Sequence, residues 1–284
     1  MAEPTSSFED IHELDLSLLP ETVARFYSQI IQWGYTAPAT VNEAYHKLGS
    51  QGRVRSMIAD SPELNAWATS HEDGFVIGLF AAAPIILHFT CNQLLRCPMV
   101  FPSVGQPQNE APETNGYTHG VPLTLPDTLP VQEACTVLPS VSRPEDDERA
   151  AAASALTELA SAFAMFHEVS HVIAGHAGYL RSSQNLALFE LTRRPIRRSH
   201  SRLLRVWEYE ADKIAAVMLL SFLVAPENQD HFADVFSISA KDSEHLVAQL
   251  TAAGISAAYI LFLLLGQRSA ALRAGSVHPH PLVV

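Results

Sequence analysis

The pattern of hydrophobic and polar positions in the first third of the chain predicts helices followed by a short piece of sheet. Residues 19–33 and 39–48 have apolar spacing typical of helices, and the first 60 residues are predicted to be helical throughout. Two apolar runs, 65–68 and 75–79, flank a polar turn that ends at Gly74. This arrangement predicts a β-hairpin.

The rest of the chain contains four more helical patterns. They cover residues 82–95, starting near Pro84, then 146–174, 203–224 and 241–265. The helix over 146–174 is rich in Ala and Leu, which are good helix formers. Residues 98–145 and the arginine-rich stretch within 181–205 show no periodicity and are predicted to be long surface loops. The sequence therefore predicts an α+β protein that is mainly helical, with a small β-sheet or hairpin.

The amino-acid composition limits which binding partners and which cellular compartment are expected for this protein. The formal net charge is −12, with 30 acidic and 18 basic residues, whereas binding to nucleic-acid phosphates needs a basic surface. The three cysteines have neither zinc-knuckle nor redox spacing, and the first ten residues lack the features of a signal peptide. The apolar runs 75–90 and 252–265 are shorter than the roughly 20 residues of a membrane span. We therefore expect a cytoplasmic protein that does not bind nucleic acid, with the apolar runs buried in its core. Shallow association of these runs with a membrane is the less favoured alternative.

The residues most informative about chemistry are His167, Glu168 and His171. Two histidines four residues apart lie on one face of a helix, where both can bind a single metal ion. On the helix face that carries His167, the positions in the preceding turns are apolar. The two imidazoles therefore extend an apolar stripe that faces the core. Catalytic zinc takes three protein ligands and one water, and a neighbouring carboxylate can remove a proton from that water during attack on a peptide carbonyl. Glu168 is placed for that role.

The third ligand has to come from elsewhere in the chain. His176 has the wrong spacing for the extended histidine motif of the metzincins, which requires a histidine at position 177. Glu208 is the better candidate, and Asp212, on the same helix face, can accept the other ring N–H of a histidine ligand. Glu210 points elsewhere and is predicted to be solvated. The alternative for this segment is an ordinary acidic first turn of a helix, which the helix dipole favours.

The C-terminal histidines are a further candidate feature. His278 or His280 can enter the site and donate a hydrogen bond to the oxyanion of the reaction. The alternative is a polar tail that happens to contain histidine. On the residues alone, the polar tail is favoured.

Taken together, these segments resemble the M48-type gluzincin metallopeptidases. The matching pieces are the Asn-Ala-Trp-Ala start of the hairpin at Asn65, the strand that ends Gly78-Leu79, the His-Glu-x-x-His helix, the Glu208-to-Asp212 segment and the late His278-Pro279. Within that group the chain looks most similar to the Lit-type phage-exclusion peptidases. The strongest local likeness is the run of residues 165–173 together with the acidic helix downstream.

The resemblance implies a zinc endopeptidase that cleaves a protein substrate, as a host-directed or phage-defence protease. The known relative cuts a translation factor, and such a factor is our guess for the protein that this chain cleaves. The implied site has His167, His171 and Glu208 as zinc ligands and Glu168 and His278 as catalytic residues. Asp212 accepts a hydrogen bond from a histidine ligand. A peptide substrate is expected to pair with an edge strand at the cleft that contains the substrate-binding residues Phe75, Val76, Ile77 and Gly78.

Two other readings of the same residues stay open. The chain can be a non-catalytic regulatory or binding protein with a structural zinc site, or a helical interaction protein in which the motif is coincidental. We expect one compact unit, with an N-terminal helical segment over 1–60 and, in the peptidase reading, the zinc peptidase domain over 61–284.

Overall fold

The computed structural model describes residues 12–34, 36–47, 53–71, 74–110, 130–131, 133, 143–179, 188–189, 198–238 and 243–271. The described helices are α1 (Glu21–Gly34), α2 (Thr36–Lys47), α3 (Ala82–Leu95), α5 (Asp147–Ile173), α7 (Arg198–Leu223), α8 (Pro226–Val235) and α9 (Ser243–Ala271), with short 3-10 helices at Leu16–Leu18 and Pro107–Asn109. The strands are β1 (Arg53–Ala59), β2 (Ala66–His71), β3 (Gly74–Phe80) and β4 (Leu188–Phe189). The predicted class, α+β and mainly helical, is confirmed.

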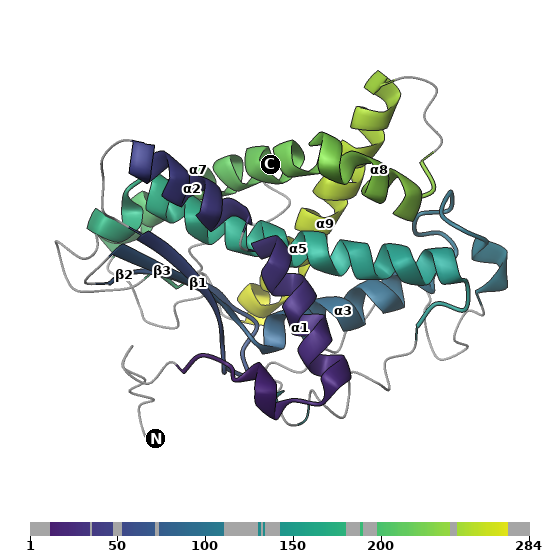
Figure 1. Cartoon of the computed structure of the whole chain (residues 1–284), viewed down its shortest axis with the longest axis horizontal. Coiled ribbons are helices and arrows are strands. Elements are labelled where there is room, and N and C mark those ends of the chain that lie inside the picture. Colours follow the sequence, from purple (N-terminus) through teal and green to yellow (C-terminus); the bar gives the residue numbers. More distant parts are fainter. Residues whose placement is uncertain are drawn as a thin grey trace.

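Helix α5 is the central element of the fold. It lies across the middle of the molecule in Figure 1, with the sheet at one end and α7 and α3 on different sides of it. It contacts α1, α2, α3, α7, α8, α9 and strands β2 and β3, and every residue from Leu159 to Val172 is buried. A helix surrounded in this way must be apolar or small on all sides, which explains its many alanines.

The sheet packs one face against the helical core. In β3, Ile77 and Leu79 belong to the main core, whereas Val76 and Phe80 lie in a second cluster with Trp67 of β2. This alternation follows from the two-residue period of a strand. Gly78 pairs with Trp67, and a side chain at this glycine would collide with the Trp67 indole.

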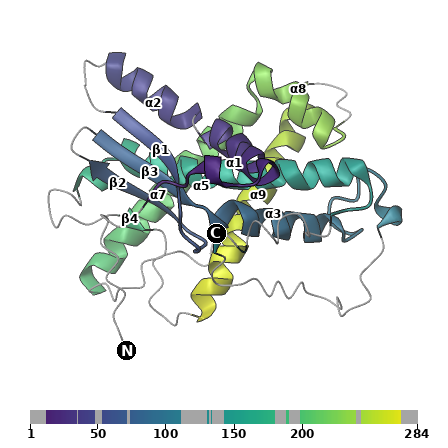
Figure 2. The same cartoon turned by 60° about the horizontal axis from the view of Figure 1, so that its bottom comes forward.

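The strand order, β1-β3-β2-β4, differs from the expected hairpin at a sheet edge. β2 and β3 form the predicted antiparallel hairpin, but β1, which falls within the segment predicted to be helical, pairs in parallel with β3. β3 is therefore an interior strand (Figure 2). On the outer side of β1, the Asn42 side chain hydrogen-bonds both the N–H and the C=O of Val54.

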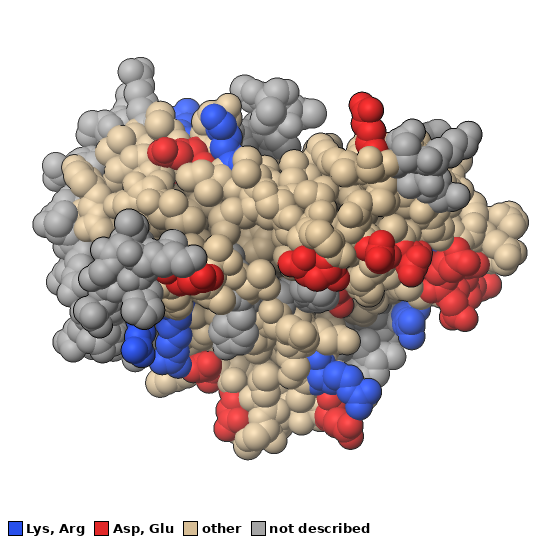
Figure 3. Space-filling model, turned by 45° about the horizontal axis from the view of Figure 1, so that its top comes forward, with Lys and Arg blue, Asp and Glu red and all other residues tan. Residues whose placement is uncertain are grey.

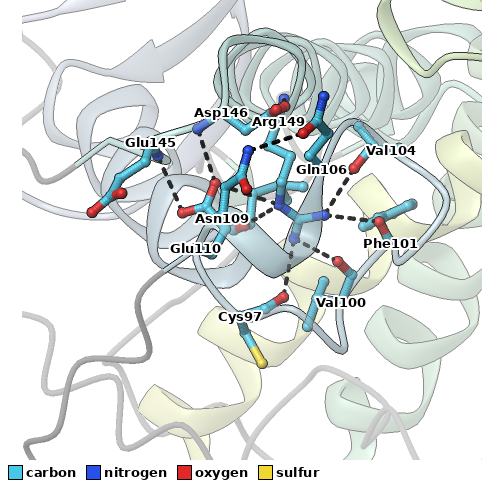
Figure 4. Close-up of polar contacts among 11 residues, drawn as sticks. Cys97, Val100, Phe101, Val104, Gln106, Asn109, Glu110, Glu145, Asp146 and Arg149 are labelled. Carbon is cyan, nitrogen blue, oxygen red and sulfur yellow. Dashed lines mark hydrogen bonds and ion pairs between the residues drawn. The ribbon is translucent and has the colours of Figure 1, made fainter.

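At its N-terminal end α5 is tied to the preceding chain by Arg149, which is fully buried. Its guanidinium donates to five backbone carbonyls at 2.8–3.0 Å, those of Leu95, Cys97, Val100, Phe101 and Val104 (Figure 4). Glu110 Oε1 lies 3.7 Å from Arg149 Nε, and its carboxylate also accepts from the N–H groups of Glu145 and Asp146. One side chain thus holds the turn that follows α3 against the start of α5.

Helix α9 is longer than the apolar run at 252–265 suggested. Its segment Ser243–Leu265 is long and apolar enough to cross a membrane, and a third of its most apolar window is buried. The core helix of a soluble protein passes the same test of length and composition. Ile255 and Tyr259 of this helix are exposed.

The net negative charge is visible on the molecular surface. Figure 3 shows acidic side chains in a row across the right half of the view, with basic side chains scattered around them. The described residues of this face do not form the basic footprint that nucleic-acid phosphates require.

Replacing Arg149 by Met should lower the free energy of unfolding by about 3–5 kcal/mol, because it leaves buried carbonyls and Glu110 without their cation. Chemical denaturation measures the change. Arg55→Met is the matched control, since Arg55 pairs with Glu13 at the surface, and it should cost less than about 1 kcal/mol. Equal losses in the two variants would contradict the role assigned to Arg149.

His88 of α3 should make stability depend on pH. Burial lowers the pKa of His88 to about 4, and the charge of Arg143 acts in the same direction. The unfolded chain binds this proton near pH 6.5. The unfolded state therefore holds more protons between these values, and the free energy of unfolding falls as the pH drops from about 6.5 towards 4, by up to about 3 kcal/mol. In His88→Phe this contribution disappears, so the stability difference between variant and wild type should change over this range. A constant difference would refute the assignment.

Candidate metal centre

The two histidines of the motif meet at the C-terminal end of α5. His167 and His171 are both buried, and their rings lie edge to face with centroids 4.8 Å apart. Their Nε2 atoms are 3.0 Å apart. The four-residue spacing on a helix accounts for this arrangement without any help from the rest of the fold.

Helix α7 places Glu208 against the same two atoms. Glu208 Oε2 lies 3.1 Å from His167 Nε2 and 3.6 Å from His171 Nε2. Glu208 is buried because α7 packs on α5 through small residues, Ala211 and Ala215. His167, His171 and Glu208 form a group that can hold a metal ion.

The spacing of the three atoms agrees with metal coordination. Ligands held at about 2 Å from an ion in a tetrahedral arrangement are roughly 3.3 Å apart. The three observed separations, 3.0, 3.1 and 3.6 Å, scatter around this value. The residues present therefore fit a tetrahedral ion without rearrangement of either helix.

The hydrogen bond to Asp212 decides which nitrogen of His167 is available to a metal. Asp212 Oδ1 lies 2.8 Å from His167 Nδ1. Because a carboxylate accepts and does not donate, Nδ1 carries the proton and the neutral ring keeps its lone pair on Nε2. That lone pair faces an oxygen of Glu208, and two acceptors at 3.1 Å need a metal cation or a proton between them. The predicted contact between Asp212 and a histidine is present.

His171 is held by two residues that sequence reasoning set aside. His176 Nδ1 lies 3.0 Å from His171 Nδ1, and His176 Nε2 lies 3.2 Å from Glu210 Oε2. Glu210 was expected to be solvated. Its side chain is 54% exposed, yet it reaches the site through His176. Burial lowers the pKa of both His171 and His176, and this outweighs the opposing effects of Glu208 and Glu210.

Glu168 is also buried in this part of α5, next in sequence to His167. The structure thus gathers His167, Glu168, His171, Glu208 and Asp212 from two helices. Trp207 completes the surroundings, with its ring stacked on His176 at a centroid distance of 4.7 Å. The clue to His176 and Glu210 was their closeness in sequence to the ligands, but spacing alone did not show that they touch.

The substrate-binding strand and the C-terminal histidines are the two remaining groups of residues that the sequence predicted for the site. The expectation of an edge strand formed by Phe75, Val76, Ile77 and Gly78 is wrong, because these residues belong to β3 and pair with β1 on one side and β2 on the other. Their backbone is used within the sheet and cannot add a peptide strand. His278 and His280 lie outside the described residues, so their role stays a prediction.

The helices that carry this site lie in a part of the chain that matches a known protein family. The family model Peptidase U49 matches residues 126–281, more than half of the chain. The chain belongs to the Peptidase U49 family. The matched region contains both helices of the candidate metal site, α5 and α7, whereas β1, β2 and β3 precede it. No curated protein and no solved structure matches the chain.

Replacing Glu208 by Gln should abolish stoichiometric binding of a divalent metal at micromolar concentrations, because the variant loses the anionic ligand between two histidines. Metal content after gel filtration, together with titration calorimetry, gives the result. Glu227→Gln, at the exposed first turn of α8, is the matched control and should bind metal like the wild type. Binding of equal strength in Glu208→Gln would show that the metal does not sit in this group.

Proposed function

We propose that this chain is a zinc-dependent endopeptidase that hydrolyses peptide bonds of a protein substrate. The observation that carries the proposal is the buried group of two histidine nitrogens and one carboxylate oxygen, with the buried Glu168 next to His167 in the sequence, in a member of a peptidase family. Two histidines and one glutamate are a ligand set that catalytic zinc uses in peptidases.

The number of ligands supports catalysis over a structural role. Structural zinc sites are closed by four protein ligands, whereas catalytic sites leave one position for water. Among the residues that the structure describes, the group consists of three. The three-ligand set therefore favours the enzyme over a regulatory protein with a structural zinc ion.

Glu168 is proposed as the general base and acid. Bound zinc supplies a water of lowered pKa and polarises the substrate carbonyl. Glu168 accepts the proton of that water and then delivers it to the leaving amine. Its burial keeps bulk water away and strengthens its electrostatic interactions within the site. His278 remains the candidate for a hydrogen-bond donor to the oxyanion.

The substrate is proposed to be a protein of the cytoplasm, in keeping with the compartment expected for this chain. Host-directed or phage-defence proteolysis, with a translation factor as target, is the form of this activity that the resemblance implies. Since β3 is interior, an extended substrate that pairs with the sheet has to use another strand.

Glu168→Gln should retain one zinc ion per chain and lose at least about 100-fold in cleavage rate, because the amide cannot take up the proton of the water. The assay detects new N-termini in β-casein and in a cytosolic extract, with and without a metal chelator. The matched control is Glu148→Gln on the exposed start of α5, where Glu148 accepts a hydrogen bond from the Ser237 hydroxyl, and it should cleave normally. Equal cleavage by wild type and Glu168→Gln would sink the mechanism.

A further inference from the structure

Beside the three proposed ligands, a chain of hydrogen bonds runs from the surface of α7 to His171. It passes from Glu210 through His176 to the ring nitrogen of His171 that faces away from Glu208. We propose that His176 and Glu210 are positioning residues that fix the tautomer and the orientation of the metal ligand His171. This inference rests on the metal site of the proposed function.

The direction of each hydrogen bond follows from the carboxylate at the outer end. Glu210 can only accept, so His176 Nε2 donates to it over 3.2 Å, and a neutral His176 then has its lone pair on Nδ1. That nitrogen accepts from the Nδ1–H of His171 over 3.0 Å. His171 is left with its lone pair on Nε2, the atom that lies 3.0 Å from His167 Nε2 and 3.6 Å from Glu208. Both histidine ligands thus direct a lone pair to the same point.

The backbone brings His176 back to the helix that it follows. Helix α5 ends at Ile173, and Gly175 has φ of +78°, a left-handed conformation that suits glycine at a helix C-terminus. This turn reverses the chain, and His176 folds under His171. Trp207 then stacks on the His176 ring with an interplanar angle of 12°, and Tyr179 packs edge-on against Trp207. The ring of His176 is therefore held in one plane by aromatic contacts as well as by hydrogen bonds.

The arrangement explains why an intermediate ring is present at one ligand and absent at the other. Asp212 lies one turn after Glu208 on α7 and reaches His167 directly. Glu210 is two residues from Glu208, which on a helix places it roughly 200° around the axis, away from the site. His176 bridges that gap. Two carboxylates of α7 therefore orient the two histidines of α5, Asp212 directly and Glu210 through His176. Partners of this kind tune metal affinity.

The test measures zinc affinity by competition with a chromophoric chelator, and the ligand field by the visible spectrum of the cobalt-substituted protein. His176→Phe keeps the volume and the stacking on Trp207 but removes the acceptor, and it should weaken zinc binding by about 10- to 100-fold and alter the cobalt bands. His176→Asn, whose side-chain oxygen can replace the acceptor, should recover most of the affinity. His88→Phe, a change of the same type in α3, should leave both readouts unchanged.

Each outcome separates this inference from the proposed function. Wild-type affinity in His176→Phe, or equal losses in His176→Phe and His176→Asn, would overturn the positioning role while leaving the zinc site intact. If the wild type binds no zinc, the metal site and this inference both fall. Should His176→Phe fail to fold, Glu210→Ala carries the test, because it changes only a half-exposed carboxylate. It should weaken zinc binding less than His176→Phe does, and unchanged affinity would overturn the proposal.

Discussion

The constraint on which this structure depends is the burial, on all sides, of residues 159–172 of the 27-residue helix α5. A buried polar group has to find its partners inside the protein, because no water can replace them. Helix α5 carries such groups at both ends. Near its start, Arg149 meets five carbonyls and Glu110, and near its end, His167 and His171 meet carboxylates from α7. The alanine-rich middle lets the surrounding helices and the sheet approach closely enough for both arrangements to form.

The two ends of α5 use opposite solutions to the same problem. At Arg149 every N–H of the guanidinium is matched by an acceptor, which makes that end a rigid anchor for the chain after α3. At the other end, the hydrogen bonds to Asp212 and His176 leave two lone pairs facing one another and an anionic oxygen. Such a group of acceptors is unfavourable until a cation or proton joins them. The same rigid helix therefore positions a site that is incomplete by itself.

Much of the fold and of the candidate site was accessible from the sequence, and the failures share a cause. The hairpin, the long helices and the motif residues depend on contacts within four or so residues, which periodicity reports. The strand β1 was read as part of a helical segment, because its pairing partner β3 lies about twenty residues further along the chain and leaves no local pattern. That single parallel pairing moved β3 from the edge of the sheet to its interior. It thereby removed Phe75, Val76, Ile77 and Gly78 from the surface that a substrate can pair with.

The sequence by itself determined the two pairs that lie one helical turn apart, His167 with His171 and Glu208 with Asp212, since four residues on a helix bring side chains to one face whatever surrounds them. Only the tertiary structure decided how these pairs meet. The packing of α7 on α5 sets Glu208 between the histidines and Asp212 behind one of them. The turn at Gly175 brings His176 against the other histidine, where Glu210 reaches it. These contacts depend on the rotation of one helix against another, and no spacing within a single segment records it.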